Sequence, residues 1–218
     1  MSITTSLLPA SPHGSSDVRL AVLLSGRGSN FASIHEAIVA GRLDAKIAAV
    51  ISNRADAPGI QRAREWGYDA HVLDHRQYAN RAAHETEVSK ILDAAHPDIV
   101  VMAGYMRLLS PTFVGAWMNR IVNIHPSLLP AFPGVDAQRQ ALVHGVKISG
   151  CTVHLVDEML DAGPIVLQRA VPVEDNDTVE SLSARILAQE HLAYPRALAL
   201  LCSGYRVDGR RVVPESPG

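Results

Sequence analysis

Short apolar runs of strand length alternate with helix-like patterns through the first part of the chain. Strands are predicted at residues 18–25, 46–52, 70–73, 98–103 and 121–125, and helices at residues 31–40, 59–66 and 80–95, with another starting at Ser110-Pro111. Strands that alternate with helices pair in parallel, because each connecting helix crosses one face of the sheet and covers it. The chain therefore predicts an α/β fold, with a mostly parallel, twisted sheet and helices on both faces.

The pattern changes after Gly134. A short helix is predicted at residues 136–143, and two strands at residues 149–156 and 164–173 are joined by a polar connection at residues 157–163. Asp177 is predicted to cap a helix that begins at Thr178. Because proline lacks the amide hydrogen that a helix needs, Tyr194-Pro195 predicts a kink or a break in that helix. Asp208-Gly209, between short apolar runs, predicts a terminal hairpin.

Composition limits the possible partners. The 20 Lys and Arg residues nearly balance the 22 Asp and Glu residues, giving a net charge of −2 without blocks of like charge, which argues against nucleic acid or an anionic membrane as partner. No apolar run reaches the roughly 18 residues that span a bilayer, so a cytoplasmic location is expected. Cys151 and Cys202 lack metal-ligand spacing. We expect residues 1–16 to be a disordered leader, residues 17–208 to form one domain, and residues 209–218 to be a tail.

The strand predicted at residues 121–125 ends in a polar pair. Asn123 and His125 lie two positions apart, so both side chains leave the same face of the strand at its carboxyl end. Three prolines follow before Gly134 and prevent a strand or a helix from continuing. Ligands of open α/β sheets bind beyond the carboxyl ends of the strands, so the pair indicates a reaction site. The alternative is a strand end whose polar groups only cap the loop.

The sequence Gly-Arg-Gly-Ser-Asn at residues 26–30 separates the first strand from the first helix. The free amides and the dipole at a helix N-terminus favour an anion, and phosphate is the natural guest. A dinucleotide fingerprint does not fit, because Phe31 occupies its third glycine position and Asn53 stands where an acidic residue would bind ribose. A P-loop does not fit either, because no Gly-Lys-Ser/Thr follows. The alternative is a tight turn in which Asn30 caps the helix.

Asp161 lies in the polar connection between the last two long strands. An aspartate there usually forms a turn or faces solvent, but beside His125 it would favour the charged imidazolium. An Asn amide and a protonated His can both donate to an oxyanion, and no activated Ser, Cys or Lys is evident. The three residues indicate acyl or formyl transfer to a nucleophile that the substrate supplies, without a metal. His154 points towards the same region, either to assist or as a satisfied strand histidine.

Two stretches resemble a known family: Asn-Ile-His-Pro-Ser-Leu-Leu-Pro-Ala-Phe-Pro-Gly at residues 123–134 and Gly-Cys-Thr-Val-His-Leu-Val-Asp-Glu-Met-Leu-Asp-Ala-Gly-Pro at residues 150–164. They are similar to the phosphoribosylglycinamide formyltransferase family, and the similarity runs in order from Val18 to about Pro195. It implies a formyltransferase fold with a Rossmann-like N-terminal half. Residues 17–117 would lie on the phosphate and nucleotide side, and residues 118–208 on the folate and catalytic side.

The resemblance also implies the reaction. A formyl group would pass from 10-formyltetrahydrofolate, a co-substrate, to the amine of 5'-phosphoribosylglycinamide in purine biosynthesis. Only small-molecule substrates are expected as partners, with neither metal nor nucleic acid nor membrane. The sequence leaves monomer and homodimer open.

The family's functional positions fall on particular residues of this chain. The catalytic residues implied are Asn123, His125 and Asp161. The ribonucleotide-binding residues implied are Gly28, Ser29, Asn30 and Glu190. The folate-binding residues implied are Arg81, Met106, Arg107, Leu108, Leu109, Asn123, Asp157, Glu158, Met159, Leu160 and Asp161. Two departures affect substrate contacts: Arg27 stands where the family is expected to carry Asn, and Gly-Val-Asp-Ala-Gln at residues 134–138 replaces a common His-containing variant.

Other functions remain as alternatives. Methionyl-tRNA formyltransferase shares the catalytic trio, but its Arg-Gly-Ala-Ala-Pro-like run and its RNA-binding domain are not expected here. Formyltetrahydrofolate hydrolase adds an N-terminal regulatory domain that residues 1–16 would not supply. A nicotinamide-dependent dehydrogenase or a non-catalytic nucleotide-binding module would fit the parallel sheet, but neither should bind a folate analogue.

Overall fold

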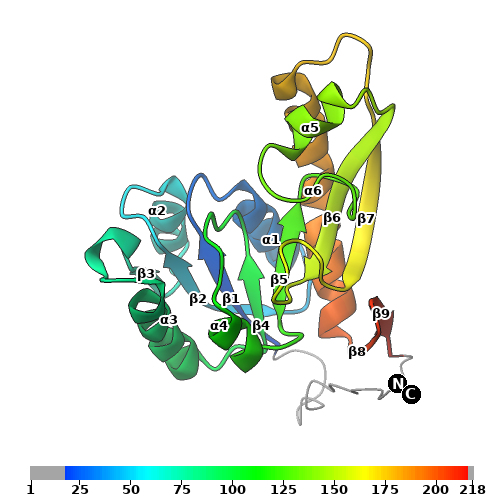
Figure 1. The fold of residues 1–218 in the computed structure, drawn as a ribbon. Helices are drawn as coiled ribbons and strands as arrows, with labels where there is room; N and C mark the ends of the chain where they lie inside the picture. The colour runs from blue at the N-terminus through cyan, green and yellow to red at the C-terminus, as the bar shows by residue number, and fades with distance from the viewer. Residues whose placement is uncertain (1–17, 216–218) are drawn as a thin grey trace.

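The computed structural model describes residues 18–215, within which nine strands form one sheet in the order β3-β2-β1-β4-β5-β6-β7-β9-β8 (Figure 1). The strands β1 (Arg19–Leu24), β2 (Lys46–Ser52), β3 (Ala70–Val72), β4 (Ile99–Met102) and β5 (Ile121–His125) pair in parallel. All five lie where the apolar runs predict them. The predicted fold class, a mostly parallel sheet with helices on both faces, is confirmed.

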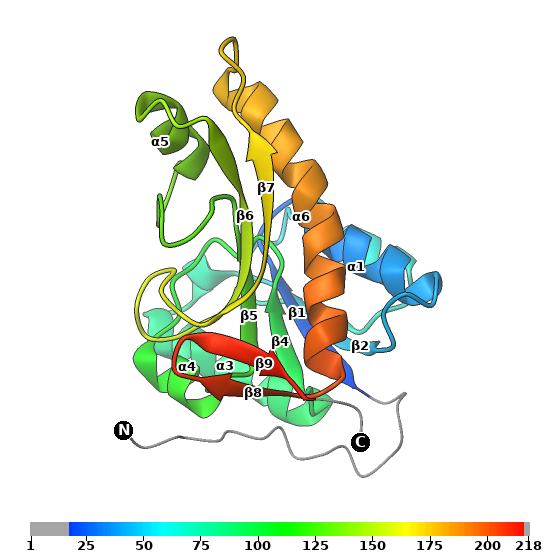
Figure 2. The same cartoon turned by 90° about the vertical axis from the view of Figure 1, so that its right-hand side faces the viewer.

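Helices cover both faces of the parallel part, as Figures 1 and 2 show. The helices of the first face are α1 (Ser29–Val39), α2 (Pro58–Glu65) and α6 (Val179–Cys202), and those of the second are α3 (Arg81–Ala95) and α4 (Pro111–Ala116). Alternate residues of β1 pack into the two layers: Leu20 and Val22 face the first, and Ala21 and Leu23 face the second. This burial on both sides explains why β1 is a continuous apolar run rather than an alternating one.

The sheet changes direction at β5. The long strands β6 (Ile148–Leu155) and β7 (Ile165–Pro172) pair antiparallel, and with α5 (Ala137–Val143) they extend away from the parallel part (Figure 1). In the register of β5 and β6, Asn123 is opposite His154 and His125 is opposite Thr152. Opposite residues of a ladder project from the same face, so polar side chains of two strands meet there.

The predicted cap of α6 is wrong, and the helix does not break at its proline. Its cap is Thr178, whose hydroxyl accepts from the Ser181 amide at 3.2 Å, while Asp177 accepts from the Ser181 hydroxyl at 2.6 Å and pairs with Arg185. The helix also continues through Pro195 to Cys202. Proline removes one hydrogen bond, but packing holds the helix on both sides of it.

Tyr194 supplies much of that packing. Its side chain is fully buried, and its hydroxyl lies 3.1 Å from the Met102 carbonyl and 2.9 Å from the Val122 carbonyl. The helix is therefore fixed against β4 and β5 directly before the proline.

The predicted terminal hairpin is confirmed as β8 (Tyr205–Asp208) and β9 (Arg211–Pro214). Because β9 also pairs with β7, the expected boundary between domain and tail at residue 208 falls inside the sheet and is wrong. The expected leader lies outside the described residues. A short 3-10 helix, η1 (His75–Gln77), completes the regular structure of residues 18–215. In this part of the chain no helix is both long enough and apolar enough to cross a membrane.

Candidate active site

His125 and Asp161 meet in a nearly closed environment. Nδ1 of His125 lies 3.4 Å from Oδ2 of Asp161, and the two side chains are only 7% and 9% exposed. On its other side, Nε2 of His125 lies 2.8 Å from the Phe132 carbonyl. Both ring nitrogens therefore face acceptors, an arrangement suited to the imidazolium, which donates from both. Asp161 is thus a buried partner of His125 and not a solvated loop aspartate.

Asp161 also fixes the loop that carries it. Its backbone is left-handed, with φ of +50°, and its Oδ2 accepts from the Gly134 amide at 2.8 Å. A Cβ atom on Gly163 would lie 1.9 Å from the Leu155 carbonyl, so only glycine lets the chain double back at this point. One carboxylate thereby ties the connection between β6 and β7 to the end of the proline-rich loop.

His154 completes the polar cluster. Its Nδ1 lies 3.0 Å from the Leu155 carbonyl and so carries the proton, while burial lowers the pKa of His154 and keeps the ring neutral. The unprotonated Nε2 lies 3.3 Å from Nδ2 of Asn123 and 3.8 Å from Oδ1 of Asp161. His154 therefore accepts one amide hydrogen of Asn123 and leaves the other for a ligand.

The glycine-containing loop has the geometry of an anion site. Helix α1 begins after Gly28, which has φ of +69° and gives no side-chain cap. A Cβ atom on Gly28 would lie 3.0 Å from the Gly59 Cα, so the loop needs glycine here. The amides of the first turn have no partners within the helix and can bind an anion. Asn30 does not cap the helix, contrary to the alternative reading.

Asn30 instead joins α1 to α6. Its Nδ2 donates to Oε2 of Glu190 at 2.8 Å, and its Oδ1 is buried without a hydrogen-bond partner in the described structure. Burial raises the pKa of Glu190, while the bond from Asn30 and the positive charge of His125 oppose that rise. The acid next to the anion loop is therefore close enough to His125 to feel its charge.

One cavity of about 620 Å³ contains the glycine-containing loop and Glu190. It is lined by the loop at residues 26–30, by Glu190, by Met106 and Arg107, and by the two residues that flank His125, Ile124 and Pro126. The structure thus brings the expected ribonucleotide residues to one cavity, next to the strand end that carries His125. Ser25, Asn53, Arg54, His75 and Gln138 also line it and were not expected from the sequence.

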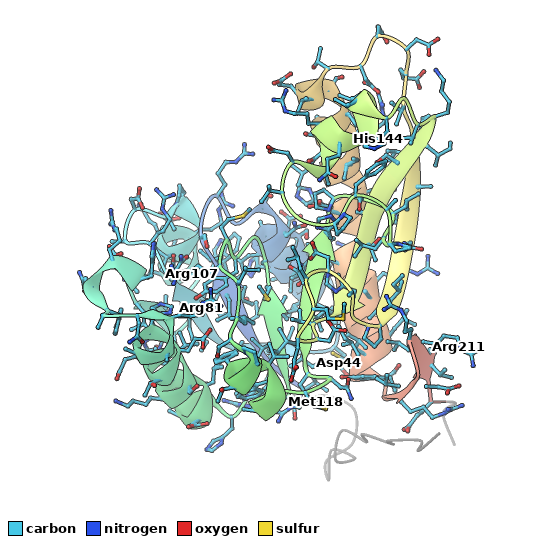
Figure 3. The ribbon with its side chains drawn as sticks, viewed as in Figure 1. Asp44, Arg81, Arg107, Met118, His144 and Arg211 are labelled. Atoms are coloured by element: carbon cyan, nitrogen blue, oxygen red, sulfur yellow. The ribbon has the colours of Figure 1, made fainter. Side chains whose placement is uncertain are left out.

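Apart from Met106 and Arg107, the expected folate residues are not among those that line the cavity. Figure 3 labels Arg81, at the start of α3, and Arg107, in the loop after β4. The pKa of His84, one turn from Arg81, is lowered by burial and further by the charge of Arg107. Large apolar side chains are exposed on two loops that also belong to this set. They are Met106 and Leu108, after β4, and Met159 and Leu160, between β6 and β7. Leu109, Asp157 and Glu158 lie in the same two loops.

The two departures from the family pattern both lie at helix starts. Arg27 is exposed, and its carbonyl accepts from the Arg62 guanidinium at 3.5 Å. Asp136 precedes α5 in a left-handed conformation and makes no capping bond with its side chain. Among residues 18–215, no three His, Cys, Asp or Glu side chains converge as metal ligands would.

Residues 18–198 match the formyl transferase family, and the chain belongs to that family. Its resemblance to phosphoribosylglycinamide formyltransferases is also confirmed. The enzyme of that name from Escherichia coli (strain K12) is 40% identical over 206 residues, covering 91% of this chain and 97% of that protein. Glycinamide ribonucleotide transformylase 1 from Symbiobacterium toebii has a crystal structure with a TM-score of 0.88 and 50% identity, covering 92% of this chain and 94% of that one.

Longer relatives contain the same domain. The trifunctional purine biosynthetic protein adenosine-3 of Drosophila melanogaster is 47% identical over 188 residues, which cover 85% of this chain. This chain spans only 14 to 19% of the length of the trifunctional relatives it matches.

Proposed function

We propose that this protein is a phosphoribosylglycinamide formyltransferase. It transfers the formyl group of 10-formyltetrahydrofolate to the amine of 5'-phosphoribosylglycinamide. The observation that carries the proposal is the buried contact of His125 with Asp161, next to Asn123 and beside a cavity that also holds an anion loop. The similarity to the Escherichia coli enzyme over nearly its whole length supports the same activity.

Each group of the trio has a role in this reaction. A bond forms between the substrate amine and the formyl carbon, and the bond from that carbon to the folate nitrogen breaks. The free amide hydrogen of Asn123 and the charged ring of His125 stabilise the oxyanion that develops on the formyl oxygen. Asp161 keeps the ring charged and orders a water that carries the proton lost by the amine to the leaving nitrogen. No covalent enzyme intermediate is required.

The binding surfaces suit the two substrates. The phosphate binds the free amides of Gly28, Ser29 and Asn30, and Glu190 accepts from ribose hydroxyls. The exposed apolar side chains of Met106, Leu108, Met159 and Leu160 suit the flat rings of a folate, and Arg81 and Arg107 suit its carboxylates. The cytoplasmic location stays a prediction, and both a monomer and a homodimer stay open.

One assay tests the proposal directly. Mixing the protein with 10-formyl-5,8-dideazafolate and glycinamide ribonucleotide should change the absorbance as the formyl group leaves the folate analogue. Omitting the ribonucleotide should abolish the change, and methionyl-tRNA should not replace it. Release of formate at a similar rate without any amine would indicate a hydrolase instead and contradict the proposal.

A further inference from the structure

The loop between β4 and α4 combines exposed apolar side chains with a firmly held backbone. Met106 is 81% exposed and Leu108 is 59% exposed. The Gly104 carbonyl nevertheless accepts from the Ser25 amide at 3.1 Å, the Met106 amide donates to Ser25 Oγ at 2.8 Å, and the Ser110 amide donates to Glu85 Oε1 at 2.8 Å. Exposed apolar side chains gain nothing for the fold, so a backbone fixed beneath them indicates a surface built for a ligand.

Ser25 forms the central anchor of this loop. It is the residue after β1, it is only 5% exposed, and its hydroxyl donates to Oδ1 of Asn53 at 2.6 Å. Asn53 follows β2 and is 2% exposed. Because the single hydroxyl hydrogen is used on Asn53, the oxygen of Ser25 is oriented to accept from Met106. A buried hydrogen-bonded chain thus connects the ends of β1 and β2 to the exposed loop.

The amides beyond the anchor are available to a ligand. Within residues 18–215, no protein group accepts from the amides of Arg107 or Leu108. Ser25 also leads directly into the anion loop at residues 26–30. Ser25 therefore lies between two loops that line one cavity, and its hydroxyl is bonded to only one of them.

We propose that Ser25, oriented by Asn53, is a positioning residue for the folate-binding loop. It holds the Met106 backbone at the place where the folate ring packs, and it does so without touching the reacting atoms. The inference rests on the proposed function for the identity of the ligand, but not for the anchoring of the loop.

Kinetics of three variants test the proposal. Ser25→Ala should raise the KM for 10-formyl-5,8-dideazafolate about five- to tenfold, the effect of losing one buried hydrogen bond. Because the reacting groups are untouched, kcat and the KM for the ribonucleotide should stay within about twofold. Asn53→Leu should act in the same direction. Ser52→Ala is the matched control, because Ser52 is fully buried but bonds only to the backbone of Arg54.

A second measurement is independent of catalysis. Hydrogen exchange of the Met106 amide should be slow in the parent protein and markedly faster in Ser25→Ala, while Ser52→Ala leaves it slow. Unchanged exchange would overturn the proposal, as would equal rises in KM for both substrates or a rise in folate KM for Ser52→Ala. If the parent protein lacks the transfer activity, the proposed function fails, and the exchange experiment still decides whether Ser25 anchors the loop.

Discussion

At the scale of single residues, the Asp161 carboxylate makes two contacts with different requirements. Its Oδ2 accepts from the Gly134 amide at 2.8 Å and also lies 3.4 Å from Nδ1 of His125. The first contact needs only an acceptor, so an asparagine oxygen could keep it. The second depends on the negative charge, which favours the charged ring. Asp161→Asn therefore removes the charge beside His125 while keeping an acceptor for the Gly134 amide.

We predict that Asp161→Asn moves only the alkaline limb of the pH profile, and towards lower pH. In the proposed mechanism the reaction needs a neutral amine, which sets the acid limb, and a charged His125, which sets the alkaline limb. Asp161→Asn removes the buried negative charge that lies 3.4 Å from the ring and favours its charged form. At neutral pH we expect kcat to fall by about 100- to 1,000-fold, with much smaller changes in KM.

Asp175→Asn is the control for that experiment, because Asp175 is 90% exposed and, within residues 18–215, pairs only with Lys147. It should leave both limbs and kcat unchanged. A near-normal kcat for Asp161→Asn, with an unmoved alkaline limb, would mean that Asp161 does not support His125.

The same residues show which features of the site can be predicted from the sequence and which cannot. Asn123 and His125 could be predicted as a pair because a strand places alternate residues on one face. The role of His154 could not, because it depends on the register that sets His154 opposite Asn123. The burial of Asp161 depends on the contact between two loops 27 positions apart, which no local pattern encodes.

At the scale of elements, the start of α1 sets the geometry of the proposed anion site. Gly28 precedes the helix and provides no side-chain cap, so the first amides remain open. We predict that Ser29→Asp raises the KM for the ribonucleotide about tenfold or more, because its carboxylate repels the phosphate. An acidic residue in a first turn favours the helix itself, so the fold should be kept. Folate binding should remain nearly unchanged.

Ser29→Ala is the control that removes the Ser29 hydroxyl alone. It adds no negative charge and should leave the ribonucleotide KM much closer to that of the parent protein. If Ser29→Asp raised the KM for both substrates equally in the same assay, the loop would be required for the fold and not for binding the phosphate.

Most elements could be predicted from the sequence, and the misses have physical causes. Apolar runs and helix-starting residues such as Asn80 and Ser110 are local signals, and both residues cap helices that begin where the sequence predicts them. Pro195 is a local signal for a break, but the contacts of Tyr194 with two strands override it. Strand β9 is short and partly exposed, and its place is set by β7, far earlier in the chain.

At the scale of the whole molecule, Glu190 links function to stability. Burial raises its pKa in the folded protein, whereas the unfolded chain leaves it near its ordinary value. The folded state therefore binds the Glu190 proton more tightly than the unfolded state does. The stability from this group is fully present below the unfolded pKa and is lost as pH rises through the folded pKa.

We predict that Glu190→Gln raises the Tm relative to the parent protein at pH 8 and changes it little at pH 4. The amide cannot ionise and can still accept from Asn30, while ribonucleotide binding should weaken. Thermal unfolding across this pH range is the measurement. Glu180→Gln is the control, because Glu180 lies in the exposed first turn of the same helix and its pKa is lowered by its own backbone amide. A Tm difference for Glu190→Gln that is independent of pH would contradict the prediction.

The cavity forms only when distant parts of the chain come together in the folded molecule. Asn53, His75 and Gln138 come from three separate parts of the chain and line it together only after the sheet and its helices assemble. No spacing in the sequence could have selected them, because each is an ordinary polar residue near the end of an element.

The bond between Asn30 and Glu190 joins residues 160 positions apart. During synthesis at about 5–20 residues per second, Asn30 leaves the ribosome roughly 8 to 32 s before Glu190 does. The first five strands and their helices can already be made by then, with the anion loop in place but its acidic partner still missing. A nascent chain therefore gains the complete proposed ribonucleotide site only with α6. A translation product interrupted before α6 lacks that site even where its first five strands have paired.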